Sequence, residues 1–320
     1  MKSLIDQTIG FENLEVILVN DCSTDSTLGK LMKYESQYPD NIIVIPLEKN
    51  VKQGAARNIA LQYATGEYLD YLDADDYMVK DAYEKLYDIA RKYDTDIIEY
   101  DEIDVTDHDT AITDTKIDED DILLTIKNDE DIQDLLMSGI YKRGCWNKFY
   151  RREFVTEHDL KYAEGCYDEE SLFTVMAIIY SQKYYRHYER LYCYYQNPAG
   201  TCYDKIKDIK RRDDNARVWF QLLNEVVERG LIDNIYEEFA VLFVENYLVR
   251  SVEFSYDRDL PLDLETINNM QSTVRCFFPD FTENKYIGTQ PALQYVLPLV
   301  GVEIKEEDRL NFIRVMASVE

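Results

Sequence analysis

The chain has 320 residues, which is enough for about two domains at roughly 150 residues each. It carries 35 basic and 63 acidic side chains, so its formal net charge is −28. A chain this acidic repels polyphosphate, which excludes broad, sequence-independent binding of nucleic acids. Because 46% of the residues are hydrophobic, the chain can bury a large core, and global disorder is excluded as well.

Strands and helices are expected to alternate in the first third of the chain. Continuous apolar runs predict buried strands, and the amphipathic segments between them predict helices. The expected strands are residues 14–20, 42–46, 67–72 and 96–100, and the expected helices are residues 28–38, 54–64 and 81–93. This alternation is typical of βαβ units, so we expect an α/β fold with a mostly parallel sheet flanked by helices.

The rest of the chain changes character twice. Residues 99–134 carry 15 acidic side chains against two lysines, which favours a solvated loop over an ion-binding tract, whereas residues 141–152 carry five basic side chains and no acid. Further on, apolar residues recur at three- and four-residue spacing over residues 218–227 and 235–249, which predicts helices there. We therefore expect an α/β domain over residues 1–203 and a helical domain over residues 204–320. No apolar run approaches the roughly 18 residues of a membrane helix, so no transmembrane segment is expected.

An acid-rich turn follows the third expected strand. It contains Asp73, Asp75 and Asp76. Carboxylates this close repel one another, so a fold keeps them together mainly where a cation neutralises them. Their hard oxygens suit Mg²⁺ or Mn²⁺ and leave positions for substrate phosphates. An exposed turn is the usual interpretation of an isolated Asp-x-Asp, but the position after a buried strand favours the metal.

Two further segments carry candidate binding residues. Asp21 and Asp25 follow the first expected strand, where a carboxylate can accept hydrogen bonds from a base or a ribose, and helix capping by Ser23, Thr24 or Asp25 is the alternative. In Gly54–Asn58, small residues lead into a helix with Arg57 one turn in. That arginine can bind a phosphate or the neighbouring aspartates, and a close-packed helix start with a structural arginine is the alternative.

These three segments, in this order and spacing, resemble the family-two glycosyltransferases of the GT-A fold. The matching stretches are LEVILVNDCSTDST, KNVKQGAARNIALQYATGEYLDYLDADDYM, CWNKFYRREF and YDEESLF, within about residues 3–200. The resemblance implies a GT-A (Rossmann-like) domain followed by a helical C-terminal domain. It also implies that a sugar is transferred with inversion from a nucleotide-diphosphate sugar, most often UDP-linked, to a hydroxyl acceptor, with Mn²⁺ or Mg²⁺ as cofactor.

The resemblance further implies roles for individual residues. The implied nucleotide-sugar contacts are Asp21, Asp25, Arg57, Asn58 and Asp73. The implied metal ligands are Asp75 and Asp73, with Asp76 in the same pattern. The implied catalytic base lies in an acidic group, with Glu170 at the matching position and Glu169 and Asp168 as neighbours. The implied acceptor side is Trp146, Asn147 and Lys148.

The sequence departs from the family pattern at three places. Glu170 stands where the family has Asp, which carries the carboxylate about one methylene further out, and Cys22 replaces a glycine. The family's first strand, which lies between the second and fourth strands of the sheet, has no counterpart before residues 3–11, so two strand edges would be unpaired. The explanations are a truncated reading of the gene, which we favour, a partner that supplies the strand, and a degenerate protein.

We therefore predict a metal-dependent, inverting glycosyltransferase that builds a cell-surface glycan or glycopolymer. Its expected partners are the nucleotide sugar and a glycan, lipid-linked or polymer acceptor, without nucleic acid, and its oligomeric state is open. The expected location is the cytoplasm, including the inner face of the membrane. Two hypotheses compete: a non-catalytic sugar- or partner-binding relic, and a nucleotidyltransferase, which would normally need a glycine-rich phosphate loop that is missing here.

Overall fold

The chain forms two compact units. The computed structural model describes residues 1–107, 112, 115–197, 208–288, 300 and 304–305. The first unit holds residues 1–165 and 169–200, and the second holds residues 166–168 and 201–320. The expected domain boundary at residues 203–204 lies outside the described residues. Among the described residues, no helix is both long and apolar enough to cross a membrane.

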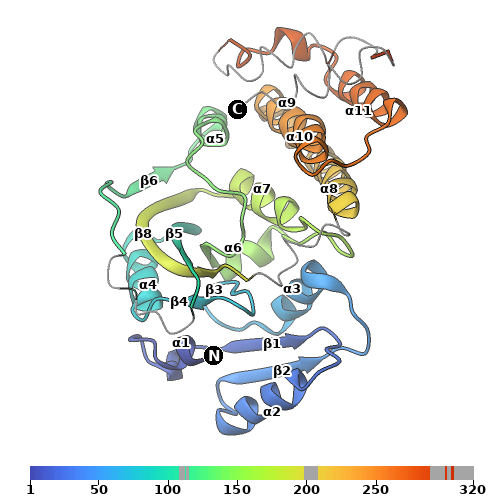
Figure 1. Ribbon diagram of the computed structural model, residues 1–320. Coiled ribbons are helices and arrows are strands. Elements are labelled where there is room, and N and C mark those ends of the chain that lie inside the picture. The colour runs from blue at the N-terminus through green and yellow to red at the C-terminus, as the bar shows by residue number, and fades with distance from the viewer. Residues whose placement is uncertain (108–111, 113–114, 198–207, 289–299, 301–303, 306–320) are drawn as a thin grey trace. The chain divides into compact units, whose positions relative to one another are not determined.

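A small parallel sheet begins the first unit. β1 (Val16–Asn20) pairs in parallel with β2 (Ile42–Pro46). α2 (Thr27–Gln37) connects the two strands and packs on them, and α3 (Lys52–Tyr63) packs on β1 (Figure 1). All four elements lie within two residues of their expected bounds, because each has a strong local signal: an apolar run or a polar turn before a helix.

Six further strands form a mixed sheet in the first unit. They are β3 (Tyr68–Leu69), β4 (Tyr77–Met78), β5 (Ile97–Val105), β6 (Ile122–Thr125), β7 (Lys148–Arg151) and β8 (Lys183–Tyr195). Their order is β3-β7-β5-β8-β4, with β6 also on β8. Only β5 and β8 pair in parallel within this described sheet. The predicted α/β arrangement is present, but the sheet is mixed rather than mostly parallel, because β7 runs antiparallel between β3 and β5 and the short strands β4 and β6 run antiparallel to β8.

Helices cover this sheet and supply its core. Figure 1 shows β8 as a strongly curved strand with α7 (Glu170–Tyr180) beside it. Every residue of α7 from 171 to 178 is buried, so this helix is apolar on all sides and belongs to the interior. The other helical elements of the unit are α1 (Lys2–Ile5), η1 (Phe11–Asn13), α4 (Ala82–Tyr93), α5 (Asp129–Met137) and α6 (Arg152–Glu157).

The acidic segment at residues 99–134 is more ordered than expected. β5 extends to Val105, and β6 and α5 follow it, so the interpretation as mainly a solvated loop is wrong. Glu99 and Asp101 are buried within β5. They form ion pairs with Lys148 and Arg186, respectively. Charge counting misjudged this segment because the basic partners lie far away in sequence.

The second unit is helical in its described residues. Its helices are α8 (Asp208–Glu228), α9 (Tyr236–Phe243), α10 (Arg250–Asp257) and α11 (Leu264–Phe277), with short turns η4 (Ile232–Asn234) and η6 (Phe281–Glu283). A π-helical turn, η5 (Val244–Val249), joins α9 to α10 without a break. Asn215 of α8 donates to the carbonyl oxygen of Asn246 in that turn at 2.8 Å. The predicted helices over residues 218–227 and 235–249 are confirmed.

Candidate active site

One face of α3 is fixed to the segment that precedes α7. Arg57 and Asn58 lie three and four positions after Gly54, so both share this face with the glycine. The Asn58 amide nitrogen donates to the carbonyl oxygen of Tyr162 and to Glu164 Oε1, both at 3.0 Å. Its amide oxygen accepts from the Tyr162 N–H at 2.9 Å. Asn58 therefore holds the two segments together through both polar atoms of its side chain.

Gly54 lies at the closest approach of this contact. A Cβ atom at Gly54 would lie 2.1 Å from the carbonyl oxygen of Ala163 and 2.9 Å from Cγ of Glu169. Real Cβ atoms essentially never approach other atoms so closely, so only glycine fits without movement of the backbone. The close approach brings the side chain of Glu169 within reach of α3.

Arg57 joins two acidic segments that are far apart in sequence. Its Nη1 donates to Glu169 Oε1 at 2.6 Å, and its Nη2 donates to Asp73 Oδ1 at 2.8 Å. The side chain is only 13% exposed and lies over the ring of Tyr162. Burial alone lowers the pKa of the guanidinium, but the surrounding ionisable groups, including both carboxylates, raise that pKa well above its usual value. Arg57 is therefore a fixed cation between the acid-rich turn and α7.

The acid-rich turn presents two carboxylates with different surroundings. Asp73 is partly buried and bound to Arg57. Asp75 is exposed and accepts from Asn197 Nδ2 at 3.0 Å. The structure thus brings Asp73 to the predicted phosphate-binding arginine and leaves Asp75 at the surface, but the predicted roles of both residues in binding stay predictions.

The third carboxylate of the turn is held by β8. Asp76 accepts from the Tyr192 hydroxyl at 2.6 Å and from the Tyr195 N–H at 2.8 Å. The same hydroxyl accepts from the Asp73 N–H at 3.2 Å. Burial raises the pKa of Asp76 to about 6, although these two donors oppose the shift. Tyr192 therefore holds the turn through both Asp73 and Asp76, and the place of Asp76 in the implied metal pattern stays a prediction.

The acid-rich turn fits a divalent cation that takes most of its ligands from phosphates and water. Among the described residues, no group of three or more His, Cys, Asp or Glu side chains is arranged to hold a metal ion, so the protein offers no closed cage. Mg²⁺ and ions of similar hardness need only one or two carboxylates when phosphates and water complete their coordination. Asp73 and Asp75 supply hard oxygen ligands in that number.

Asp70 connects this turn to the loop that precedes β7. The Tyr100 hydroxyl lies 3.1 Å from both oxygens of Asp70, and the Tyr71 N–H donates to one of them at 2.8 Å. The hydroxyl also lies 3.2 Å from the carbonyl oxygen of Trp146. Desolvation raises the pKa of Asp70 to about 7, although the hydrogen bonds oppose this shift.

Asp21 and Asp25 serve as helix caps. The carboxylate of Asp21 accepts from the N–H groups of Val51 and Lys52, at 2.7 and 2.9 Å, where α3 begins. Asp25 Oδ1 accepts from the Thr27 N–H at 2.9 Å, where α2 begins, and hydrogen bonds from the side chain and the N–H of Thr27 lower the pKa of Asp25. The capping alternative therefore applies to Asp25, and Asp21 holds the start of α3 in a similar way. Their contact with a nucleotide stays a prediction.

The three candidate bases have different environments. Glu169 is 4% exposed and bound to Arg57. Glu170 begins α7, and its Oε2 accepts from the Cys145 N–H at 3.1 Å. Asp168 belongs to the second unit, has a φ of 56°, and its Oδ1 lies 3.9 Å from Arg211. Glu169 therefore belongs with Arg57 and Asp73, whereas Glu170 contacts the loop that carries the predicted acceptor-side residues. Which acid is the base stays a prediction.

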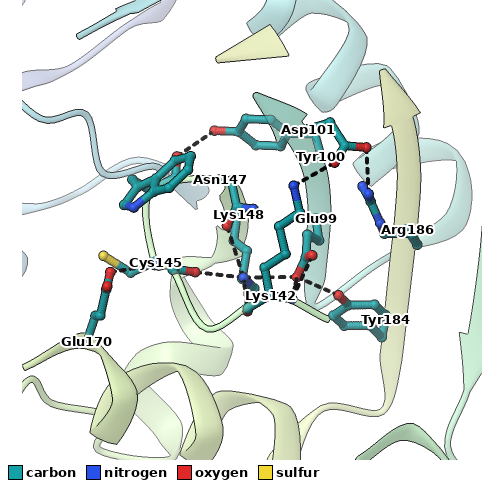
Figure 2. A network of polar contacts seen from close by, with 12 residues as sticks. Glu99, Tyr100, Asp101, Lys142, Cys145, Asn147, Lys148, Glu170, Tyr184 and Arg186 are labelled. Carbon is teal, nitrogen blue, oxygen red and sulfur yellow. Dashed lines mark hydrogen bonds and ion pairs between the residues drawn. The ribbon is translucent and has the colours of Figure 1, made fainter. Parts of the chain in front are cut away.

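The predicted acceptor-side residues separate into one accessible and two buried side chains. Trp146 is partly buried, and its ring centroid lies 4.7 Å from that of Tyr192. Asn147 and Lys148 are 0% exposed, and Lys148 pairs with Glu99 (Figure 2). The prediction that Asn147 and Lys148 face an acceptor is therefore corrected: β7 begins at Lys148, and the register of β7 on β5 places Lys148 opposite Glu99. Trp146 is the one that can still meet an acceptor.

The family model described as Glycosyl transferase family 2 matches residues 1–158. This part of the chain is therefore similar to the family 2 glycosyltransferases. A poly(ribitol-phosphate) beta-glucosyltransferase from Bacillus spizizenii is 39% identical over 100 residues, which is 30% of this chain and 15% of that protein. The uncharacterized glycosyltransferase YibD from Escherichia coli is 27% identical over 197 residues, which is 61% of this chain and 56% of YibD. The chain thus spans less than two thirds of the length of either relative.

A solved structure extends the similarity beyond residue 158 to the fold of the whole chain. The crystal structure of S. aureus TarS 1-349 in complex with UDP-GlcNAc matches with a TM-score of 0.68 and 21% sequence identity, over 100% of this chain and 85% of that chain. The predicted fold class is therefore confirmed: a GT-A fold with a central sheet flanked by helices, followed by a helical C-terminal region.

Sequence reasoning missed several residues that shape the candidate site. The charge reversal between residues 99–134 and 141–152 indicates that the two segments attract each other, but it does not distinguish Glu99 from the other acids of its segment. Tyr192 is one of 27 tyrosines, and no local pattern distinguishes it. Asn197 lies 122 positions from Asp75, so only the folded chain connects them.

Proposed function

We propose that this protein transfers a sugar from a nucleotide-diphosphate sugar to an acceptor hydroxyl, with inversion at the anomeric carbon. The family of residues 1–158 supports a glycosyl transfer. The observation that carries the proposal is the contact of Arg57 with both Asp73 and Glu169. A donor diphosphate at the acid-rich turn and an acceptor near the start of α7 would then lie on either side of one guanidinium.

The donor is proposed to be UDP-linked. The TarS 1-349 crystal structure, which shares the fold, is described as a complex with UDP-GlcNAc, and this supports the choice of nucleotide. With a net charge of −28, the chain needs local cations to attract an anionic donor. Arg57 would donate to the diphosphate, and Asp21, Asp25 and Asn58 are the other residues proposed at the nucleotide-sugar side.

A divalent cation, Mn²⁺ or Mg²⁺, is proposed at Asp75 and Asp73. When bound, such an ion neutralises the negative charge that develops on the departing diphosphate. The exposed position of Asp75 supports this assignment. An ion that takes most of its ligands from the substrate's phosphates must be reached by the substrate from solvent. Arg57, fixed beside Asp73, would stabilise the same charge with its guanidinium N–H groups.

Glu170 is the proposed general base. Its carboxylate would accept the proton of the acceptor hydroxyl while that oxygen bonds to the anomeric carbon and the bond to the diphosphate breaks. Attack from the face opposite the leaving group gives inversion. Trp146 would stack on a sugar ring of the acceptor. The similarity to a poly(ribitol-phosphate) beta-glucosyltransferase supports a cell-surface glycan or glycopolymer as acceptor, assembled at the cytoplasmic side of the membrane.

Two conservative variants test the donor and base assignments. Titration calorimetry of UDP with Mn²⁺ should detect binding to the wild type and lose it in Asp75→Asn. Asp88→Asn, an exposed aspartate on α4, is the matched control and should bind as the wild type does. Glu170→Gln should keep donor binding and lose sugar transfer, while Glu157→Gln, exposed at the end of α6, should keep both. Unchanged UDP affinity in Asp75→Asn would refute the metal assignment.

A non-catalytic relic is the second candidate. One observation favours it: among the described strands, β1 pairs only with β2, and β3 pairs only with β7, so the sheet is interrupted between the segments that carry Asp21 and Asp73. The same calorimetric titration separates the two candidates. Metal-dependent binding of UDP to the wild type supports the enzyme, and no heat with UDP and Mn²⁺ supports the relic.

A further inference from the structure

A completely buried ion pair lies beneath the loop that precedes β7. Glu99 Oε2 and Lys148 Nζ are 2.9 Å apart, and both side chains are 0% exposed. The two residues face each other across the antiparallel pair of β5 and β7. Figure 2 shows that both side chains point toward Lys142 at the start of the loop. A buried ion pair is weak evidence for stability, because desolvation of the two charges offsets much of their attraction.

The lysine of this pair binds the loop backbone. Lys148 Nζ donates to the carbonyl oxygens of Lys142 and Gly144, at 2.6 Å each, and to Asn147 Oδ1 at 3.0 Å. Together with Glu99, these acceptors exceed the three N–H groups of an ammonium, so every donor has a partner. The loop at residues 142–147 is therefore wrapped around one ammonium group.

The glutamate of the pair binds the first residue of the same loop. Both oxygens of Glu99 accept from the Lys142 N–H, at 2.9 and 3.1 Å. The Tyr184 hydroxyl donates to Glu99 Oε2 at 2.7 Å and holds the carboxylate in place. Since Glu99 and Tyr100 are consecutive in β5, they lie on opposite faces of the sheet, and Tyr100 contacts the carbonyl oxygen of Trp146 from the other face.

Cys145, in the middle of this loop, contacts the proposed base. The Cys145 N–H donates to Glu170 Oε2 at 3.1 Å, and Cys145 lies between the Gly144 carbonyl that Lys148 binds and Trp146. We propose that Glu99 and Lys148 are positioning residues, which fix the loop so that the Cys145 N–H orients the Glu170 carboxylate. The consequence for catalysis rests on the proposed function, but the contact itself does not.

Hydrogen exchange of the Cys145 amide tests the contact without any substrate. Glu99→Leu/Lys148→Met removes both charges together, which avoids leaving one charge buried alone. Leu86→Ala, at a fully buried position of α4 in the same unit, is the control for a general loss of stability. We expect the Cys145 amide to exchange at least tenfold faster in the double variant than in Leu86→Ala. An amide as protected in the double variant as in the control would overturn the proposal.

If the double variant does not fold, Tyr184→Phe decides the question. This change removes one donor to Glu99 and keeps both charges. If the Cys145 amide exchanges faster in Tyr184→Phe than in Leu86→Ala, the proposal is supported. If it exchanges equally fast in the two variants, the proposal is overturned.

The catalytic consequence is tested by the separation of rate and binding. In the double variant we expect kcat to fall about 100-fold, as misplaced catalytic groups typically cause, with unchanged affinity for UDP and Mn²⁺. In a Glu170→Gln background, the double variant should not lower the residual rate of transfer any further, because both changes act on one carboxylate. A further loss of similar size in that background would refute positioning of Glu170. If the wild type transfers no sugar, the proposed function fails, while the exchange result still decides whether the pair holds the Cys145 contact.

Discussion

Replacement of Gly54 by alanine tests the packing that assembles the candidate site. The new Cβ would lie 2.1 Å from the Ala163 carbonyl oxygen, whereas ordinary contact begins at 3.4 Å, so α3 or the facing backbone must move by about 1.3 Å. Such overpacking typically costs about 1–3 kcal/mol. The weakened hydrogen bonds of Asn58 and of Arg57 cost about 1 kcal/mol for each of the two residues. Alanine returns at most about 1 kcal/mol through its higher helix propensity. We expect the free energy of unfolding to fall by about 2–4 kcal/mol.

The structure offers a matched control for this substitution. Gly29 is also within a helix, α2, but a Cβ there would have no atom within 4 Å. Gly29→Ala should therefore raise the free energy of unfolding by about 0.5–1 kcal/mol. Urea unfolding of both variants at one pH measures the two changes. A Gly54→Ala variant that is as stable as Gly29→Ala would show that α3 does not pack on this segment.

Three further predictions concern the polar groups around the site. The pKa of Asp70 is raised to about 7 from 3.8, so the folded state binds more protons between these values, and the free energy of unfolding should fall as the pH rises from about 4 to 7. Urea unfolding across this range should show a smaller fall in Asp70→Asn. Asn58→Ala should lower the free energy of unfolding by about 2–4 kcal/mol, measured in the same way, because it leaves buried groups of Tyr162 unpaired. Asp21→Ala should lower the thermal midpoint through loss of about 1–2 kcal/mol of capping, and Asp21→Asn should lower it less.

Local signals account for the parts of the fold that could be predicted. The strand at residues 42–46 and the helix at residues 28–38 depend on short apolar runs and turn residues, and both appear within one residue of the expected bounds. The third strand was expected over residues 67–72, but β3 is only Tyr68–Leu69. The chain leaves the sheet there because Asp70 bonds to Tyr100 and the following residues form the acid-rich turn.

The convergence of Arg57 with Asp73 could be expected from the order of the motifs, because both segments were assigned to the same ligand. The partners of buried charges could not. Glu99 meets Lys148 only because β7 pairs with β5 in one register, and that register is set by strands and helices from the whole unit. A strand shifted by one residue would turn every side chain to the other face, so no local pattern fixes such a pair.

Helix capping and ligand binding both need a short side chain with an acceptor oxygen near a helix start. A sequence motif therefore does not distinguish the two roles. Asp21 was expected to bind a nucleotide, yet its carboxylate already accepts two backbone N–H groups. A short side chain with an acceptor oxygen serves either purpose. The structure therefore identifies what Asp21 does for α3: its carboxylate fixes the first two N–H groups of that helix start.

Arg57 has two interpretations that one pair of measurements separates. As a structural residue it neutralises Asp73 and Glu169, and as a ligand residue it would bind the donor diphosphate. Arg57→Lys keeps the charge but cannot reach both carboxylates in the same way, so we expect a loss of about 1.5–3 kcal/mol in the free energy of unfolding. If the arginine also binds the diphosphate, the affinity for UDP with Mn²⁺ should fall in Arg57→Lys and stay unchanged in Leu86→Ala, which weakens the packing of the same unit at a fully buried position away from the proposed donor residues. Equal UDP affinities in the two variants would leave Arg57 with the structural role alone.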